Sequence, residues 1–297
     1  MSGLFGGIEA GGTKWICAVG TGPEDIRERI RIETTTPEVT LQAVLDFFRQ
    51  VQEAHGRLAA LGIACFGPVD LRRDSPTWGF ITETPKPDWA GTDVAGFLSR
   101  ELDLPVAFDT DVNGAALGEL TWGAGRGLES LVYVTVGTGI GGGLIVGGEP
   151  VHGLVHPELG HVLPPRHPDD SFVGICPFHG HCMEGLASGP AIEKRWGRPA
   201  PELPEDHPAW DMEAFYLGTL AANLTLTLSP QRIIFGGGVN EAPGLQRKVR
   251  QRLVTALSSY VQSPALADGA ETFLVAPELG SAAGICGAFE LASRRSR

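Results

Sequence analysis

Two stretches of this 297-residue chain share one pattern, in which apolar, β-branched runs flank a turn rich in glycine. Residues 4–19 read LFGGIEAGGTKWICAV, and residues 131–148 read LVYVTVGTGIGGGLIVGG. Runs of this length and composition, bounded by glycine, predict β-hairpins. Glycine also lets successive backbone N–H groups approach an anion such as phosphate and point at it. One such hairpin in each half predicts a duplicated architecture that binds a phosphate between the halves.

The second turn also matches a competing pattern. Gly137, Gly139 and Gly142 have the G-x-G-x-x-G spacing of dinucleotide sites, which requires a helix directly afterwards to receive the pyrophosphate. The next residues, 144–146 and then two further glycines, are too few and too β-branched to form that helix. An NAD-dependent oxidoreductase is therefore disfavoured, and no G-x-x-x-x-G-K-[ST] sequence offers a P-loop. The plain alternative is a hairpin whose glycines serve the turn alone.

Net charge, hydropathy and cysteine content limit the classes of partner and the cellular location that we expect. The net charge is −12 and no basic tract is present, which argues against nucleic acid or an anionic membrane as the main partner. No apolar run approaches the roughly 18 residues of a membrane span, and no signal-peptide pattern opens the chain. Five cysteines are too few for a disulfide framework at this length, so we expect cytosolic thiols and a cytoplasmic protein.

Strands alternate with helices in both halves, which predicts an α/β fold. We expect strands near residues 26–32, 61–66, 105–108, 233–235 and 273–276, and helices near 40–55, 184–196, 212–229, 245–261 and 281–293. Another helix should begin near Asp111. Residues 76–89, rich in proline with two tryptophans, predict an irregular cleft wall or a surface loop pinned by its aromatics. We place an N-terminal domain at residues 1–120, joined by the C-terminal helix at 281–297, and a C-terminal domain at 121–280.

Cysteine and histidine gather in one segment, CPFHGHC. Cys176, His179 and Cys182 are each separated by two residues, a spacing that predicts a knuckle around one structural zinc ion. The candidates for the fourth ligand are His161, His156 and His167. Such a site supplies on the order of 10 kcal/mol of coupled folding energy, enough to order a proline-broken loop. Four protein ligands leave no open position for catalysis, and loop residues without a metal are the alternative.

Two further segments lie where α/β sheets place ligands, at the end of a strand. Asp109 and Asp111 follow one predicted strand and precede a helix. The triple glycine at residues 236–238 follows another strand and precedes another helix, which is typical of an anion or nucleotide corner, or of a tight turn.

Five motifs together are similar to the ROK family, and within it to the bacterial fructokinases. They are EAGGTK at 9–14, DVNGAALGE at 111–119, VGTGIGGG at 136–143, HPELGH at 156–161 and CPFHGHCMEGLASGP at 176–190. The resemblance implies the actin-like, hexokinase-type ATPase fold, with two α/β domains around a central cleft and a small zinc-bound loop at 156–184. It also implies a homodimer that takes ATP, Mg²⁺ and a sugar.

The resemblance assigns roles by position. Asp111 matches the catalytic base that takes a proton from the sugar hydroxyl as it attacks the γ-phosphoryl of ATP, and Asp109 is its competitor. The implied sugar ligands are Asn113, Glu158, His161 and Glu184. The implied zinc ligands are His161, Cys176, His179 and Cys182. The phosphate loops are Gly11, Gly12, Thr13 and Lys14, then Gly137, Thr138 and Gly139, with Gly236, Gly237 and Gly238 on the adenosine side.

Two positions depart from the family pattern. Glu9 stands where most members have Asp near the Mg²⁺ shell, so we expect its metal contact to run through water. His179 replaces a third cysteine, as the fructokinase branch allows, and His181 is left over as a solvated side chain. The expected activity is phosphorylation of a hexose, with fructose favoured and mannose or glucose as alternatives. A sugar-responsive repressor is disfavoured because the first hairpin begins at Leu4, which leaves no room before it for a DNA-binding domain, and because the charge is −12.

Overall fold

The computed structural model describes residues 3–296, and the chain divides into two compact α/β units. Unit 1 contains the residues up to Gly127, Glu149–Pro157 and the residues from Glu278 onward. Unit 2 contains Leu128–Gly148 and Glu158–Pro277. The C-terminal segment therefore belongs with the N-terminal residues. Among the described residues, no helix combines the length and apolar character that crossing a bilayer requires.

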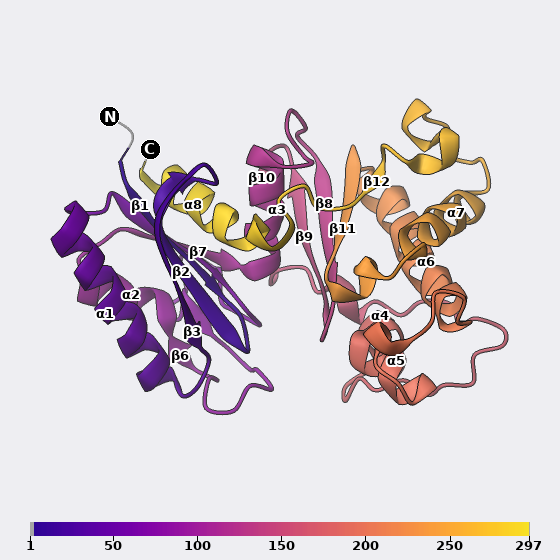
Figure 1. The fold of residues 1–297 in the computed structure, drawn as a ribbon, viewed down its shortest axis with the longest axis horizontal. Coiled ribbons are helices and arrows are strands. Elements are labelled where there is room, and N and C mark those ends of the chain that lie inside the picture. Colours follow the sequence, from indigo (N-terminus) through magenta and orange to yellow (C-terminus); the bar gives the residue numbers. More distant parts are fainter. Residues whose placement is uncertain (1–2, 297) are drawn as a thin grey trace. The chain divides into compact units, whose positions relative to one another are not determined.

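Unit 1 is built on a five-stranded sheet with the order β3-β2-β1-β4-β7 (Figure 1). Its strands are β1 (Phe5–Ala10), β2 (Lys14–Gly22), β3 (Asp25–Glu33), β4 (Ala60–Cys65) and β7 (Val106–Thr110). Strands β1, β2 and β3 are antiparallel, whereas β4 and β7 run parallel to β1. The register aligns Ala10 with Cys65 and Cys65 with Thr110, so the residues that follow β1 and β7 leave the same edge of the sheet.

Helices cover both faces of this sheet. The helices are α1 (Pro37–His55), α2 (Val94–Leu102), α3 (Asp111–Trp122) and α8 (Ala283–Ser296), and the short strands are β5 (Phe80–Ile81), β6 (Thr92–Asp93) and β10 (Glu149–Pro150). Helices α1 and α2 share one apolar core with the sheet, and α8 forms another with β1, β2 and β4. Helices α3 and α8 approach closely because they meet at glycines: a Cβ on Gly287 would lie 1.6 Å from the Gly114 carbonyl oxygen.

Residues 76–89 form the proline-rich segment of unit 1, and side-chain hydrogen bonds hold it near both of its ends. Trp89 is fully buried and its indole N–H donates to the Thr35 carbonyl at 2.8 Å. The buried Asp70 carboxylate accepts hydrogen bonds from Arg72, Ser75 and Thr77. The segment, which contains β5, is therefore held in place by Trp89 and by the Asp70 carboxylate.

Asp70 gives the protein a pH-dependent stability. The hydrogen bonds from Arg72 outweigh the effect of burial and hold the pKa of Asp70 well below its usual range. Its stabilisation is present above the unfolded pKa and is lost as the pH falls through the folded one. We expect Asp70→Asn to cost about 1–3 kcal/mol at pH 7 and progressively less in acid. Urea unfolding of both proteins from pH 7 to pH 2.5 measures the difference between their free energies of unfolding. A difference that stays constant with pH would contradict the prediction.

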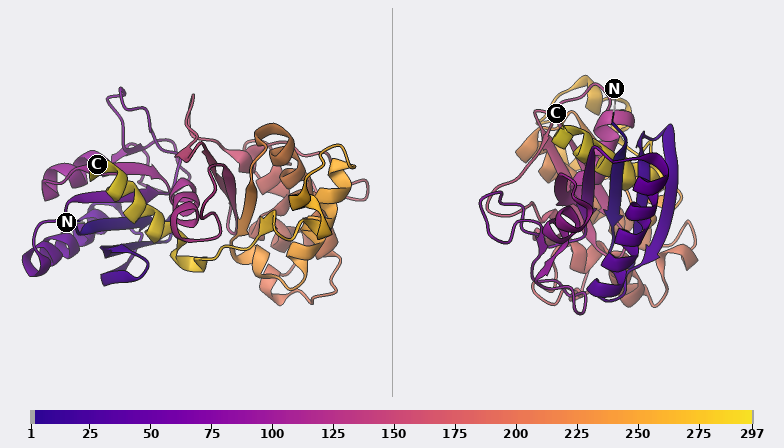
Figure 2. Two further views of the ribbon diagram at one scale, coloured as in Figure 1. Left: turned by 90° about the horizontal axis from the view of Figure 1, so that it is seen from above. Right: turned by 90° about the vertical axis from the view of Figure 1, so that its left-hand side faces the viewer.

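Unit 2 contains four strands of a second sheet, in the order β9-β8-β11-β12. Strands β8 and β9 form an antiparallel hairpin, and β11 pairs in parallel with both β8 and β12. The strands are β8 (Leu131–Val136), β9 (Ile140–Val146), β11 (Arg232–Gly236) and β12 (Leu274–Val275). The helices are α4 (Met183–Ala187), α5 (Gly189–Trp196), α6 (Ala209–Leu228) and α7 (Leu245–Leu257), grouped together in Figure 2. The register places Gly236 opposite Thr135, so the residues after β8 and after β11 leave the same edge.

Short 3₁₀ helices complete the two units. They are η1 (Leu159–His161), η2 (Ala200–Glu202), η3 (Gly238–Glu241), η4 (Pro264–Leu266), η5 (Asp268–Ala270) and η6 (Gly280–Ala282).

Both predicted hairpins are confirmed, since β1 pairs with β2 and β8 with β9 in antiparallel register. Two predicted helices differ from the structure. The helix expected at 184–196 is two helices, because Ser188 ends α4 and its hydroxyl caps α5. The helix expected to reach residue 261 ends at Leu257, where Ser258 turns into the left-handed conformation. A 3₁₀ helix, η3, begins at Gly238 within the triple glycine and precedes α7.

Candidate functional site

The strand-to-helix corner of unit 1 holds two carboxylates in different surroundings. Asp111 is the first residue of α3, and the helix begins there because the Thr110 hydroxyl accepts the Asn113 N–H at 3.1 Å. A carboxylate in the first turn is favoured by the helix dipole. Asp111 is partly exposed, whereas Asp109 is buried with 3% of its surface accessible. Burial raises the pKa of Cys65, and the nearby Asp111 charge adds to the rise.

Asp109 is occupied by contacts within unit 1. Its Oδ1 accepts the Thr110 N–H at 2.8 Å and the Asn113 side-chain N–H at 2.7 Å. Its Oδ2 lies 2.9 Å from Nε2 of His152, and this contact, more than the opposing loss of hydration, raises the pKa of His152. Sequence reasoning missed this link, because His152 lies 43 residues away and no spacing rule joins the two.

The contacts of Asp109 fix the orientation of Asn113. Since the Asn113 Nδ2 group donates to Asp109, its Oδ1 must be the atom that faces away. That oxygen is buried and has no hydrogen-bond partner among the described residues. A buried acceptor without a partner costs about 1–3 kcal/mol, so it is suited to a donor supplied by a ligand. Asn113 therefore presents an acceptor, not a donor, to anything bound at this corner.

The first glycine turn leaves the same edge of the unit 1 sheet as Asp111. The Gly11 N–H donates to the Lys14 carbonyl at 2.9 Å, which closes the turn. Gly12 is partly exposed, and Thr13 and Lys14 are exposed, so they project from the edge. Glu9 in β1 lies just before this turn.

The Glu9 carboxylate is compatible with a nearby cation. Burial raises the pKa of Glu9, although Lys14 and Arg29 oppose the rise. Its Oε2 atom is buried without a hydrogen-bond partner among residues 3–296. A Cβ on Gly284 would lie 2.6 Å from the Glu9 Cδ, so the carboxylate is packed directly against α8. An oxygen in this state fits the oxygen-rich shell that Mg²⁺ prefers.

The second glycine turn and the triple glycine are neighbours in unit 2. The Gly137 N–H donates to the Gly139 carbonyl at 2.9 Å and so closes its own turn, with Thr138 between them. Gly237 adopts a φ of 89°, and a Cβ there would lie 2.4 Å from the Val136 carbonyl oxygen. Gly238 has no atom within 4 Å of an added Cβ, so it faces open space. The backbone of these segments is therefore crowded at Gly237 and open at Gly238.

Glu184 joins the second turn to α4. Its Oε2 accepts the Ile140 N–H at 3.0 Å, and a Cβ on Gly139 would lie 2.7 Å from the same oxygen. Glu158 lies near enough for electrostatic coupling: loss of hydration raises the pKa of Glu158, and the Glu184 charge adds to the rise. The structure thus brings Glu158, Glu184 and the second turn together in unit 2.

His161, Cys176, His179 and Cys182 form a four-residue group whose ligand atoms all lie within 4.8 Å of one another. The Nδ1 atom of His161 is 3.5 Å from Cys182 Sγ and 3.8 Å from Cys176 Sγ, and His179 Nδ1 is 3.7 Å from Cys176 Sγ. Tetrahedral zinc with ordinary Zn–S and Zn–N bonds needs S···N separations of about 3.6 Å. The donor set and its spacing therefore fit zinc.

The other two candidates for the fourth ligand lie elsewhere. His156 belongs to unit 1, where its Nε2 accepts the Val69 N–H at 3.1 Å; burial lowers the pKa of His156, which favours the neutral acceptor. His167 accepts the Asp169 N–H through Nδ1 at 3.2 Å and packs against Phe215. Of the three histidines, His161 is the one that joins the cysteines.

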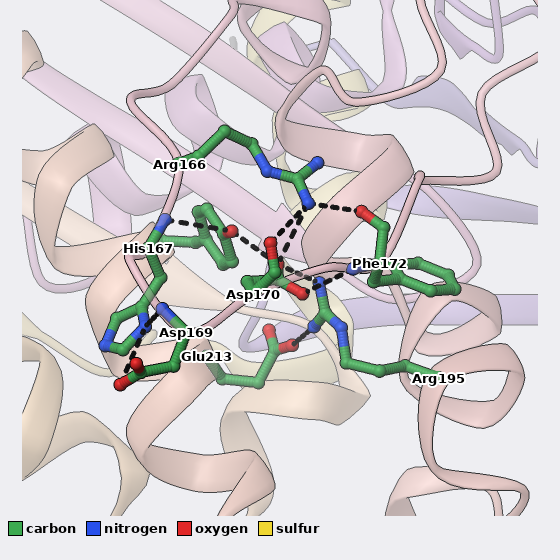
Figure 3. A network of polar contacts seen from close by, with 8 residues as sticks. Arg166, His167, Asp169, Asp170, Phe172, Arg195 and Glu213 are labelled. Atoms are coloured by element: carbon green, nitrogen blue, oxygen red, sulfur yellow. Dashed lines mark hydrogen bonds and ion pairs between the residues drawn. The ribbon is translucent and has the colours of Figure 1, made fainter.

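A buried polar network anchors the segment that precedes the cysteines (Figure 3). Asp170 forms a 3.0 Å ion pair with Arg195 of α5 and accepts the Tyr216 hydroxyl of α6. Burial opposes ionisation of Asp170, but the hydrogen bonds from Tyr216 and Phe172, together with the charges of Arg195 and Arg166, outweigh it and lower the pKa of Asp170. Arg195 also faces the fully buried Glu213 at 3.7 Å, and Tyr216 has its pKa raised to about 12, first by burial. Charged side chains thus hold this loop on α5 and α6.

Comparison with known proteins agrees with this arrangement. The ROK family model matches residues 5–295. A fructokinase of Zymomonas mobilis is 47% identical over 293 residues, covering 97% of this chain and 96% of the relative. The crystal structure of a ROK hexokinase from Thermus thermophilus superposes with a TM-score of 0.79 at 28% identity, covering 97% of both chains. A ROK family glucokinase from Streptomyces griseus, solved with glucose and AMPPNP, gives 0.74 at 26% identity, covering 98% of this chain and 100% of that one.

The chain belongs to the ROK family. Its fold is that of the actin-like, hexokinase-type ATPases, as the motifs predict. These results confirm the family resemblance.

Proposed function

We propose that the protein is an ATP-dependent hexose kinase that converts D-fructose to fructose 6-phosphate. The observation that carries the proposal is the 47% identity to a fructokinase over nearly the whole of both chains. The glucokinase of known structure is more distant, at 26% identity. Mannose or glucose as the preferred substrate is the alternative, because a few hydrogen bonds separate such isomers.

Asp111 is the proposed general base. It must accept the proton of the attacking sugar hydroxyl, which requires a carboxylate within hydrogen-bond reach of that oxygen. Its partial exposure at the start of α3 supports this role, whereas Asp109 is buried and engaged by three other groups. Asn113 next to it would accept a hydrogen bond from a second sugar hydroxyl through its unpaired Oδ1.

Glu158, Glu184 and His161 are the proposed sugar ligands of unit 2. A carboxylate accepts hydrogen bonds from sugar hydroxyls. Burial, and then the Glu184 charge, raise the pKa of Glu158, and sugar donors near Glu158 would oppose that rise. His161 turns Nδ1 toward the two thiols, which leaves Nε2–H as a donor for substrate.

The glycine segments are the proposed nucleotide ligands. Because the N–H groups of Gly11 and Gly137 close their own turns, the phosphate donors expected are Gly12, Thr13 and the Lys14 ammonium in unit 1, and Thr138 and Gly139 in unit 2. Gly236, Gly237 and Gly238 would line the adenosine side, with Gly238 open to it. Mg²⁺, when bound, would neutralise charge on the transferring phosphoryl group, with Glu9 near its water shell. These groups position the nucleotide.

Zinc is the proposed occupant of the Cys/His group, with a structural role. His161 lies three residues after Glu158, and Cys182 lies two residues before Glu184. One ion held by His161 and Cys182 would therefore join the segments that carry both carboxylates. His181 is exposed and stands outside the group. Loss of the ion should weaken sugar binding as well as folding.

Three further expectations concern the setting of the enzyme. We infer a homodimer from the family resemblance, a cytoplasmic location from the need for ATP, and no nucleic-acid partner from the net charge of −12. Light scattering at micromolar protein concentration would give the assembly mass; the mass of one 31.4 kDa chain would contradict the dimer.

A coupled ADP-release assay with fructose, mannose and glucose tests the function directly. We expect the largest kcat/KM with fructose, dependence on Mg²⁺, and loss of turnover when ATP is omitted. A larger kcat/KM for mannose or glucose would select the alternative substrate. No sugar-dependent ADP release with any of the three would reject the kinase.

A further inference from the structure

Unit 1 contains a cavity of about 420 Å³ that the proposed reaction does not use. It is bounded by β7, α3, α8, β10 and the loop after β4. Its polar lining consists mainly of Arg73, Asp109, Glu149, His152, Arg294 and Arg295. Three guanidinium groups on one cavity are unusual in a chain with a net charge of −12.

The acidic groups of the cavity wall are already engaged by partners. Asp109 accepts from Asn113 and contacts His152 at 2.9 Å. Glu149 forms a 2.9 Å ion pair with Arg294, which also reaches Glu290 at 2.9 Å. The charge of Arg294 is thus balanced within the protein.

Arg73 and Arg295 differ from Arg294. Within the described part of the chain, neither forms an ion pair with a carboxylate. The Arg73 guanidinium lies 4.7 Å from the ring centre of Trp78, a contact that orients it without neutralising it. Loss of hydration lowers the pKa of Arg73, and the positive charge of Arg295 adds to the effect, although the Asp109 carboxylate partly opposes it. Two mutually repelling cations therefore line one hollow, and a bound anion would relieve both effects.

We propose that this cavity binds a small oxyanion of charge −2, a phosphate or a dicarboxylate, between Arg73, Arg295 and the imidazole of His152. Guanidinium groups suit such ligands because their planar donors bind two oxygens at once. The volume of about 420 Å³ accommodates an anion of this size.

The site also has a connection to the proposed sugar corner, and this consequence rests on the proposed function. His152 contacts Asp109, which orients Asn113. The charged groups around His152 are Asp109 from β7, Glu149 from β10 and Arg73 from the loop after β4, and the imidazole of His156 is also close enough to feel the His152 charge. Asp109 and Glu149 favour its protonated form, and Arg73 opposes it. An anion beside Arg73 would favour protonated His152, and so keep Asp109 ionised and Asn113 in place.

The test uses the full chain without nucleotide or sugar, so its outcome does not depend on catalysis. The ring Cε1–H signal of His152, identified by its absence in His152→Gln, is followed by NMR as inorganic phosphate or malonate is added. NaCl at matched ionic strength is the reference. We expect saturable shifts and a rise in the pKa of His152 of about 1 unit. Saturation by phosphate alone, or by malonate alone, identifies which oxyanion the site takes.

Matched variants assign the response to the cavity. The double variant Arg73→Gln, Arg295→Gln should abolish the shift of the His152 signal. Arg295→Gln alone, at an exposed position near the end of α8, should weaken anion binding at least several-fold, and it serves as the test if the double variant does not fold. Arg49→Gln with Arg57→Gln removes two exposed arginines of unit 1 that already have acidic partners, and should change nothing. No shift beyond that of NaCl, or an equal shift without Arg73 and Arg295, would overturn the proposal.

Discussion

Replacing Asp111 by asparagine is expected to lower kcat for sugar phosphorylation by about 10²–10⁴-fold, the usual contribution of a general base. Asparagine keeps the size and the position at the start of α3 but cannot accept a proton at neutral pH. Sugar affinity should stay within a few-fold of wild type, because other groups bind the remaining hydroxyls. Steady-state kinetics with fructose, and calorimetric titration of the sugar, measure the two effects separately.

Two further substitutions make this result specific. Asp109→Asn removes the negative charge and leaves one acceptor oxygen where Asp109 uses two, so it cannot both accept from Asn113 and accept from His152. It should therefore raise KM for the sugar more than it lowers kcat. Asp103→Asn, at an exposed position of the same unit, should behave as wild type. If Asp109→Asn lost turnover and Asp111→Asn kept it, the two carboxylates would exchange roles.

The second large effect is expected on removing a ligand of the Cys/His group. Cys182→Ser should reduce zinc to well below one ion per chain and lower the melting temperature by roughly 10 °C, since structural zinc supplies folding energy and about 3 kcal/mol corresponds to that shift at this size. KM for the sugar should rise in parallel, because Cys182 lies two residues before Glu184. Metal analysis, thermal unfolding and kinetics on one preparation report all three.

The segment 176–182 contains a matched control for this prediction. His179 and His181 are both exposed and two residues apart, but only His179 belongs to the four-residue group. His179→Ala should therefore lose zinc and stability, and His181→Ala should keep both. Equal behaviour of the two variants, or a wild-type protein that is stable and free of zinc, would remove the structural role of the metal.

Local sequence rules anticipated much of the fold because its elements are defined by short-range chemistry. The two glycine hairpins follow from β-branched runs around glycine, and α3 begins where Asp111 follows a threonine cap. The residues at which helices end are harder to predict from the sequence. Ser188 and Pro190 divide one apolar run into α4 and α5, and a helical period alone does not reveal that break.

Contacts between distant segments were beyond a single sequence. His156 lies in a motif rich in potential metal ligands, yet it accepts a hydrogen bond from Val69, 87 residues away. Asp109 and His152, and Arg195 and Asp170, meet only because their elements pack together. Spacing alone identifies Cys176, His179 and Cys182 and leaves the fourth ligand open. The family resemblance implies His161 for that position, and the structure places His161 in the group.

We infer that this chain transfers a phosphoryl group from ATP to fructose with Asp111 as the base. The most direct measurement is ³¹P and ¹³C NMR of the purified protein with ATP, Mg²⁺ and ¹³C-labelled fructose, run beside the Asp111→Asn variant. We expect a phosphate ester at C6 of fructose and equimolar ADP, formed rapidly by the wild type and very slowly by the variant. Inorganic phosphate without any sugar phosphate, or equal rates in the two proteins, would contradict it.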